Sequence, residues 1–282
     1  MITPADAAYP ERLRELQKNA PQQLYCIGDI GLLQYPCAAV VGSRKATAYG
    51  KWAAYQAGRI LAEYGIVTVS GMAYGCDAAA HKGALDSGGK TIAVLACGAD
   101  VCYPSSNQSL YKRILRDGLV ISENPPGTPP LRGLFPKRNR IISGMSDLVA
   151  VAEAGVHSGS LITAGQALEQ GREVMAFPGN ITSASSLGCN LLIRDGAAPV
   201  TAPEDLILQL GRELRAKVPA DNAVLSGEEK EVFRIIKENM PVSPDRIAEK
   251  SGLDIRRVNA VVSILEIHGL VIRSGDRILV AK

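Results

Sequence analysis

Short apolar runs alternate with longer amphipathic segments over most of the first two hundred positions. The apolar runs span residues 38–41, 66–70, 91–96, 119–123, 147–153 and 173–178. Their length and their continuous apolar character are typical of strands buried on both faces of a sheet. Longer segments at 49–65, 77–88, 107–118 and 160–171 lie between them, and each ends on a glycine, as helices commonly do. The alternation predicts an α/β domain with a mainly parallel sheet and helices on both faces.

The pattern changes after residue 210. Residues 211–224 are polar and contain a proline, which is typical of a linker. Ser226, followed by Glu229, forms a capping box that begins the first of three short helical segments, and two β-rich runs around a Ser-Gly-Asp turn follow. We therefore expect a large domain at 1–210, a linker at 211–224 and a small winged-helix domain at 225–282.

The residues that directly follow the first two predicted strands are small, hydroxylic or basic. Gly42, Ser43, Arg44 and Lys45 follow the first strand, and Ser70 with Gly71 follows the second. In parallel sheets ligands bind outside the carboxyl ends of the strands, so backbone N–H groups, a hydroxyl and a guanidinium meet there as an anion cradle. The spacing differs from GxGxxG, so a dinucleotide is not indicated. A plain tight turn with a surface arginine remains an equal alternative.

Three cations in four residues begin another predicted helix beside an aromatic residue. The segment comprises Phe135, Lys137, Arg138, Asn139 and Arg140. A charge run of this kind is usually a solvated helix face. Its place among strands whose other loops also suit phosphate favours a polyanion site instead.

A third loop enters a helix through Ser158, Gly159, Ser160 and Thr163. The hydroxyls of Ser160 and Thr163 could bind phosphate oxygens at the helix N-terminus, but capping of the helix is the commoner role of such residues. Asp77 and His81, four residues apart, lack further ligands for a metal and an adjacent nucleophile for catalysis, so we expect a structural role for them. The sequence thus predicts neither a metal site nor a cofactor.

Composition limits which partners and which cellular compartment the sequence allows. A net charge of +3 does not by itself indicate a nucleic-acid partner, and with 5% aromatic residues phosphate contacts would have to carry most of any affinity for single strands. The six cysteines are scattered, which favours reduced thiols. Neither an apolar signal core nor a membrane-spanning run is found, so we expect a cytoplasmic protein without a membrane partner.

Four segments, in this order and spacing, closely resemble the core of the DprA/Smf (DNA-processing protein A) family. They are VVGSRKATAYG (40–50), SGMAYGCDAAAHKGAL (70–85), FPKRNRIISGMS (135–146) and SGSLITAGQALEQGREVMAFPG (158–179). The resemblance extends over about residues 9 to 210, and the tail resembles the family's winged helix. Many members begin with an additional small helical domain, whereas this chain enters the core almost directly at Tyr9 and Pro10.

The resemblance implies an extended Rossmann fold that binds single-stranded DNA without strong sequence preference. It further implies a homodimer that protects incoming DNA and loads a RecA-type recombinase during natural transformation, without enzymatic activity. The family's GSR motif implies that Arg44 is the central phosphate contact and that Gly42 and Ser43 form its turn. Its FPxRNR and SGSxxTA motifs imply that the basic segment at 135–140 and the serine-rich loop at 158–163 complete the pocket.

Two alternatives remain open at the level of sequence. A nucleotide or nucleoside-phosphate hydrolase resembling the LOG-type phosphoribohydrolases could use the same rim, but the PGGxGTxxE loop of those enzymes corresponds here to residues 158–164, which lack the glutamate. Glu153 and Glu169 are the remaining, weak candidates for a general base. The second alternative is that the protein is mainly a scaffold whose winged helix and dimer face recruit partners.

Overall fold

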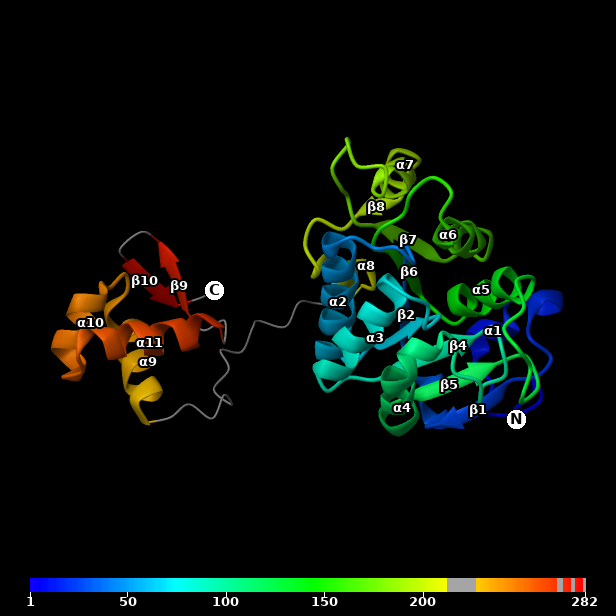
Figure 1. The fold of residues 1–282 in the computed structure, drawn as a ribbon, viewed down its shortest axis with the longest axis horizontal. Helices are drawn as coiled ribbons and strands as arrows, with labels where there is room; N and C mark the ends of the chain where they lie inside the picture. The colour runs from blue at the N-terminus through cyan, green and yellow to red at the C-terminus, as the bar shows by residue number, and fades with distance from the viewer. Residues whose placement is uncertain (212–226, 268–270, 275–276, 281–282) are drawn as a thin grey trace. The chain divides into compact units, whose positions relative to one another are not determined.

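The computed structural model describes residues 1–211, 227–267, 271–274 and 277–280. The chain divides into two compact units, residues 1–214 and 215–282, and each has its own apolar core (Figure 1). The predicted capping residue Ser226 and most of the predicted linker lie outside the described residues.

The first unit is built on an eight-stranded sheet with the order β1-β5-β4-β3-β2-β6-β7-β8. The strands are β1 (Tyr25–Gly28), β2 (Cys37–Val41), β3 (Val67–Ser70), β4 (Thr91–Leu95), β5 (Leu119–Ser122), β6 (Leu148–Val151), β7 (Glu173–Ala176) and β8 (Ala198–Pro199). All neighbours are parallel except β1, which pairs antiparallel with β5 at one edge. This confirms the predicted α/β fold with a mainly parallel, Rossmann-like sheet.

The direction of chain progression reverses at β2. Strands β3 to β5 extend the sheet to one side of β2, and β6 to β8 extend it to the other. Val41 at the end of β2 therefore pairs with Val151 at the end of β6. Reversal of this kind is a topological switch point, where the two loops diverge and leave a crevice at the carboxyl edge.

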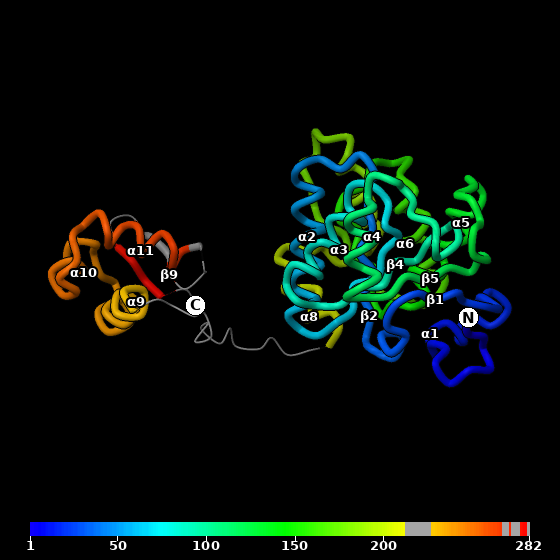
Figure 2. Tube along the Cα trace, turned by 60° about the horizontal axis from the view of Figure 1, so that its bottom comes forward, coloured from blue at the N-terminus to red at the C-terminus, as the bar shows by residue number. Residues whose placement is uncertain are grey.

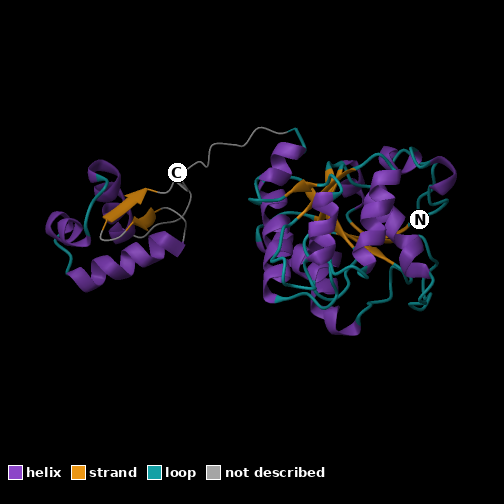
Figure 3. Ribbon diagram, turned by 90° about the horizontal axis from the view of Figure 1, so that it is seen from above, coloured by secondary structure: helices purple, strands orange, loops and turns teal. Residues whose placement is uncertain are grey.

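Helices cover both faces of this sheet (Figure 3). One face carries α2 (Ala48–Glu63), α3 (Cys76–Asp86), α4 (Gln108–Asp117) and α8 (Asp205–Gln209); the other carries α1 (Glu11–Arg14), α5 (Leu134–Gly144), α6 (Gly159–Glu169) and α7 (Leu187–Arg194). Short 3₁₀ turns lie at Gln17–Asn19, Ile30–Gln34 and Ser105–Asn107. Helices α2 and α3 lie side by side (Figures 1 and 2), because small residues such as Ala53, Ala57 and Ala80 let them approach closely.

The second unit is a winged helix, as predicted. Helices α9 (Gly227–Asn239), α10 (Pro244–Ser251) and α11 (Ile255–Ile267) precede an antiparallel hairpin of β9 (Val271–Ser274) and β10 (Arg277–Val280). Ser243 caps α10 by accepting a hydrogen bond from the Arg246 N–H, and the helix ends at Gly252 in the left-handed conformation. An apolar cluster that includes Ile236, Ile247 and Val262 holds the three helices together.

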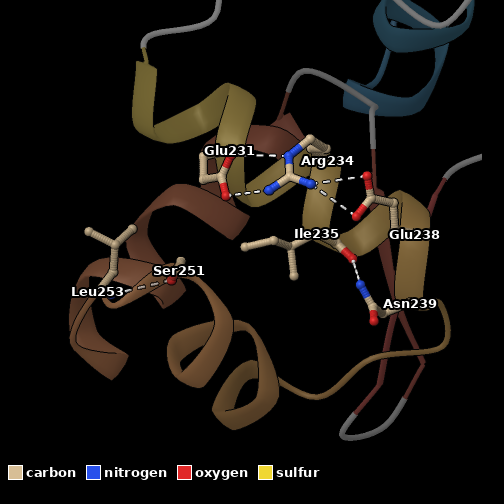
Figure 4. Close-up of polar contacts among 7 residues, drawn as sticks. All are labelled: Glu231, Arg234, Ile235, Glu238, Asn239, Ser251 and Leu253. Carbon is tan, nitrogen blue, oxygen red and sulfur yellow. Dashed lines mark hydrogen bonds and ion pairs between the residues drawn. The ribbon is translucent and has the colours of Figure 1, made fainter.

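On the surface of α9, Arg234 lies between two glutamates of the same helix (Figure 4). Arg234 donates hydrogen bonds to Glu231 at 2.6 Å and to Glu238 at 3.0 Å, although its side chain is 56% exposed. At the end of the same helix the Asn239 amide donates to the Ile235 carbonyl oxygen at 2.8 Å. The charge of Arg234 is therefore already neutralised by two carboxylates of its own helix.

Candidate functional site

A cleft of about 1120 Å³ lies at the switch point of the sheet. Three segments that are distant in sequence supply most of the predicted site residues to its lining: Gly42, Ser43, Arg44 and Lys45 after β2, Phe135, Arg138 and Asn139 from α5, and Ser158, Gly159, Ser160 and Thr163 from α6. The structure thus brings together the anion cradle, part of the basic segment and the serine-rich helix start.

The loop after β2 is held by close backbone contacts that require glycine. A Cβ on Gly42 would lie 2.5 Å from the Cys76 sulfur. Gly75 has φ +75°, and a Cβ there would lie 2.2 Å from the Ser43 carbonyl oxygen. That oxygen accepts a hydrogen bond from the Cys76 N–H at 3.2 Å. The loops after β2 and β3 are therefore pressed together, which fixes the backbone from which Arg44 projects.

Glu153, one of the two carboxylates considered as a general base, tethers the same loop. Its backbone oxygen accepts from the Ser43 N–H at 2.7 Å, and its carboxylate accepts from the Thr47 N–H at 3.0 Å and from the Thr47 hydroxyl. Thr47 in turn caps α2 by accepting from the Gly50 N–H. With Glu153 only 2% exposed, both oxygens serve the loop, and neither is open to a substrate.

Arg44 is exposed in the cleft and packs on a ring instead of a carboxylate. Its guanidinium carbon lies 4.9 Å from the centre of the Phe135 ring, a cation–π contact. Phe135 in turn contacts Tyr103, with ring centres 5.7 Å apart. Within the described parts of the chain Arg44 has no ion pair, so its guanidinium is oriented while its N–H donors stay available to an anion.

The N-terminus of α6 faces the same space. Ser158 caps this helix: its hydroxyl accepts from the Ser160 N–H at 3.4 Å and lies 2.7 Å from the Ser160 hydroxyl. Thr163 lies one turn further and is 2% exposed. The capping role expected of Ser160 or Thr163 is therefore taken by Ser158 instead. The positive end of the helix dipole is directed at the cleft, which favours a bound anion there.

Arg138 lines the cleft but is only 6% exposed. It donates hydrogen bonds to the carbonyl oxygens of Gly71, at 2.9 Å, and Val94. Burial lowers the pKa of Arg138 to about 10. Burial also raises the pKa of Asp77, although the charge of Arg138 opposes that shift. Arg138 therefore joins α5 to the ends of β3 and β4 through the donors of its Nη1.

Four predicted site residues do not line the cleft. The Ser70 hydroxyl is buried and donates to the Val40 carbonyl oxygen at 2.6 Å, and Gly71 lies behind Arg138. Lys137 and Arg140 line a separate cavity of about 310 Å³, where Arg140 pairs with Glu123 at 2.6 Å.

Helical geometry explains the division of the basic segment between two cavities. Residues three and four positions apart share a helix face. Phe135 and Ile142 therefore face the cleft, whereas Lys137 and Arg140 face the second cavity, and Arg138 borders both. The sequence pattern suggested that all the basic side chains of this segment share one surface, whereas the helix directs them to two cavities.

Several cleft residues escaped the sequence reasoning. Tyr103 follows β4, whose end carries no basic or glycine-rich signal, and Arg132 is an isolated cation in a proline-containing loop. Ser185, from the loop after β7, lines the opposite side. His157 lay within the serine-rich loop but was not assigned a role.

The structural role expected for Asp77 and His81 is supported by their contacts. His81 is fully buried, and its Nδ1 lies 2.6 Å from the Thr91 hydroxyl, which donates its own proton to the Thr68 carbonyl oxygen. The imidazole must therefore donate to Thr91 through Nδ1. Burial, aided by the nearby positive charge of Arg138, lowers the pKa of His81 to about 3.

The described residues show no sign of two other classes of site, a metal centre and a membrane-spanning helix. Among them no three His, Cys, Asp or Glu side chains are grouped so that they could hold a metal ion. Their helices include none with the length and apolar character needed to cross a bilayer. All six cysteines are free thiols.

Comparison with known proteins assigns the chain to a family. The family described as DNA recombination-mediator protein A matches residues 1–211, and the DprA winged helix domain matches residues 216–277. The DNA processing protein DprA of Streptococcus pneumoniae is 47% identical over 204 residues, which cover 72% of each chain. Protein Smf of Escherichia coli is 39% identical over 283 residues, covering 95% of this chain and 74% of the relative.

Solved structures agree with the sequence comparisons. DprA from S. pneumoniae superposes with a TM-score of 0.71 at 44% identity, covering 76% of this chain and 74% of that chain. DNA processing protein A from Helicobacter pylori, whose structure concerns its single-stranded DNA binding mode, gives a TM-score of 0.65 at 32% identity and covers 71% and 92%. From the profile match over both units and these relatives, we conclude that the chain belongs to the DprA/Smf family of DNA processing proteins.

Proposed function

We propose that the cleft binds single-stranded DNA with little sequence preference. The observation that carries the proposal is Arg44, an exposed cation held over Phe135 beside the N-terminus of α6. A guanidinium and the positive end of a helix dipole suit phosphates, and the rings of Phe135 and Tyr103 suit unpaired bases. The single-stranded DNA binding mode of the H. pylori relative supports the same ligand.

A binding role is favoured over hydrolysis by the state of the carboxylates near the cleft. Both oxygens of Glu153 are engaged by Thr47, and Asp77 is buried beside Arg138. Glu169 is the last residue of α6, whereas the N-terminus of that helix faces the cleft. A general base needs a carboxylate that can reach the substrate. Glu153 and Glu169 do not offer one, and Asp77, which lines the cleft, is only 6% exposed and accepts a hydrogen bond from the Ala73 N–H at 3.3 Å. We therefore propose a non-enzymatic role.

The remaining parts of the proposal rest on family membership. We propose that the protein acts in the cytoplasm as a homodimer, protects incoming single strands and loads a RecA-type recombinase onto them during natural transformation. The match to a DNA recombination mediator supports the recombinase as partner. A scaffold role for the winged helix is compatible with this, because partner recruitment and strand binding would use different units.

Fluorescence anisotropy with labelled oligo-dT, single-stranded and duplex, tests the cleft. Wild type is compared with Arg44→Ala and with the control Arg116→Ala. Arg116 is 74% exposed, pairs with Asp117 at the end of α4 and lies outside the cleft lining. We expect Arg44→Ala to weaken single-strand binding by about tenfold or more at low salt, because a charge-assisted phosphate contact is lost. Arg116→Ala should bind like wild type.

Two results would contradict the proposal in different ways. Unchanged affinity of Arg44→Ala would remove the phosphate role of the cleft. A wild-type protein that does not bind single strands even at low salt would remove the DNA-binding function itself and favour a nucleotide ligand instead.

A further inference from the structure

We propose that Tyr49 and Trp52 form a second nucleobase-stacking site, which receives bases of the strand where it leaves the cleft beside Lys45. The inference rests on the proposed function and extends the path of the strand beyond the cleft. The residues concerned lie in the first turn of α2, directly after the loop that carries Arg44.

The two rings form an exposed stack. Their centres are 6.0 Å apart and their planes differ by 26°. Tyr49 and Trp52 are three residues apart and so share one face of α2. Tyr49 is 40% exposed and Trp52, the one tryptophan of the chain, is 51% exposed. Large aromatic surfaces are favourable to bury, and an unpaired base offers a flat face of matching size and polarity.

The stack is held in place before any ligand arrives. The Tyr49 hydroxyl donates to the Pro178 carbonyl oxygen at 2.6 Å, which joins the start of α2 to the loop after β7. That loop also contributes Ala184 and Ser185 to the cleft lining. On the other side Thr47 caps the helix and is bound by Glu153. The Tyr49 ring is thus held next to a loop that lines the cleft, and it supports the Trp52 ring, so less entropy is lost when a base stacks on the pair.

The surrounding charge matches a nucleic-acid backbone. Lys45 lines the cleft on the side of α2, and Lys51 precedes Trp52; both are exposed. In the described residues neither lysine forms an ion pair. A strand whose bases stack on Tyr49 and Trp52 would therefore find cations for its phosphates on the path from Arg44 outward.

An exposed aromatic pair can also serve a protein interface, for example with a second copy of the chain. The structure favours nucleic acid, because the pair continues a phosphate-binding loop and is flanked by lysines. The expectation that phosphates carry most of the affinity changes accordingly, because Tyr49 and Trp52 would add base stacking to that of Phe135 and Tyr103.

Tryptophan fluorescence can test the proposal, because Trp52 is the sole tryptophan of the chain and its emission reports on this site alone. The full chain is titrated with oligo-dT of about 4 to about 20 nucleotides, following anisotropy and tryptophan emission together. We expect emission to be quenched by long oligonucleotides and to change little with those too short to leave the cleft. Trp52→Ala should weaken binding of long oligonucleotides about fivefold and leave the shortest unaffected. Trp52→Phe should retain most of the affinity.

Tyr35→Ala is the matched control. Tyr35 is 58% exposed but precedes β2, at the amino edge of the sheet, so its loss should not change binding. Binding by anisotropy without a change in emission, with Trp52→Ala equal to wild type at every length, would overturn the second site and leave the cleft intact. Emission that depends on protein concentration, with association seen by sedimentation, would assign the pair to an interface between copies. A wild type that binds no single strand overturns both proposals.

Discussion

Two exposed arginines, one in each unit, differ in what surrounds them. Arg44 at the carboxyl edge of the sheet rests on the Phe135 ring and forms no ion pair in the described residues, although the buried carboxylate of Asp77 lines the same cleft. Arg234 on α9 is enclosed by Glu231 and Glu238, whose hydrogen bonds and charges raise its pKa further. An aromatic ring orients a guanidinium and leaves its donors free, whereas two carboxylates consume them. The neighbours of a cation, more than its exposure, decide whether it can bind an anion.

Two further arginines of the winged helix are also paired with carboxylates. Arg246 pairs with Glu249 at 3.2 Å, and Arg257 pairs with Glu228 at 2.7 Å. A basic residue neutralised in this way contributes little to the long-range attraction of a polyanion. These paired arginines of the winged helix should therefore add little to its attraction for single strands.

The largest expected effect is on the free energy of unfolding, and it contrasts the buried Arg138 with the exposed Arg234. Arg138→Met removes the donors that serve the Gly71 and Val94 carbonyl oxygens and leaves Asp77 buried without its compensating charge. We expect the free energy of unfolding to fall by about 3–5 kcal/mol. Urea denaturation followed by Trp52 emission measures it, because Trp52 lies in the same unit.

Arg234→Ala is the control for this comparison and should leave that transition unchanged, since its ion pairs are exposed and lie in the other unit. The double variant Arg138→Met with Asp77→Asn should recover part of the loss. If Arg138→Met unfolds at the same urea concentration as wild type, the arginine does not hold α5 to the sheet.

The stability of the two units should respond differently to acid pH. The pKa of His81 is about 3 in the folded protein, below its ordinary value of 6.5, so the unfolded chain binds the additional proton between these values. Stability of the first unit is therefore lost as pH falls from 6.5 towards 3, at about 1.4 kcal/mol per pH unit. The described core of the winged helix is apolar and should not share this slope.

Comparison with His81→Asn isolates the histidine, because an asparagine amide can still donate to the Thr91 hydroxyl but does not titrate. Asp77, whose pKa is raised by burial, contributes with the opposite sign in both proteins and cancels in the difference. The two stability profiles should diverge in slope below pH 6.5, as measured by calorimetry at a series of pH values. Parallel profiles would show that His81 is not held neutral by burial.

Much of the sheet could be predicted from the sequence, because its central strands are buried on both faces and are therefore continuously apolar. The six predicted strands correspond to β2 through β7, with ends that differ by at most two residues. The edge strands were missed for the same reason. Tyr25–Gly28 is half exposed and Ala198–Pro199 is two residues long, so neither gives an apolar run.

The cleft was predictable where a loop follows a strand directly, and less so where a helix distributes its side chains. Arg44 and Ser158 were placed correctly on one rim, since the carboxyl ends of parallel strands meet there. Lys137 and Arg140 were assigned to the same rim, but the periodicity of α5 directs them to another cavity. Trp52 was counted among the residues of a helix, and its exposure depends on tertiary packing that the sequence pattern does not encode.

The smallest expected effect tests the two arginines by salt dependence. Each phosphate contact releases counterions, so the slope of log Kd against log salt should fall by about one when Arg44 is replaced by alanine. Arg234→Ala should keep the wild-type slope, because Glu231 and Glu238 already neutralise that charge. Anisotropy with single-stranded oligo-dT at several salt concentrations measures both variants. Equal slopes for Arg44→Ala and wild type would place Arg44 against a base or a sugar instead of a phosphate. A reduced slope for Arg234→Ala would mean that the strand displaces its carboxylates, and the contrast between the two units would then no longer hold.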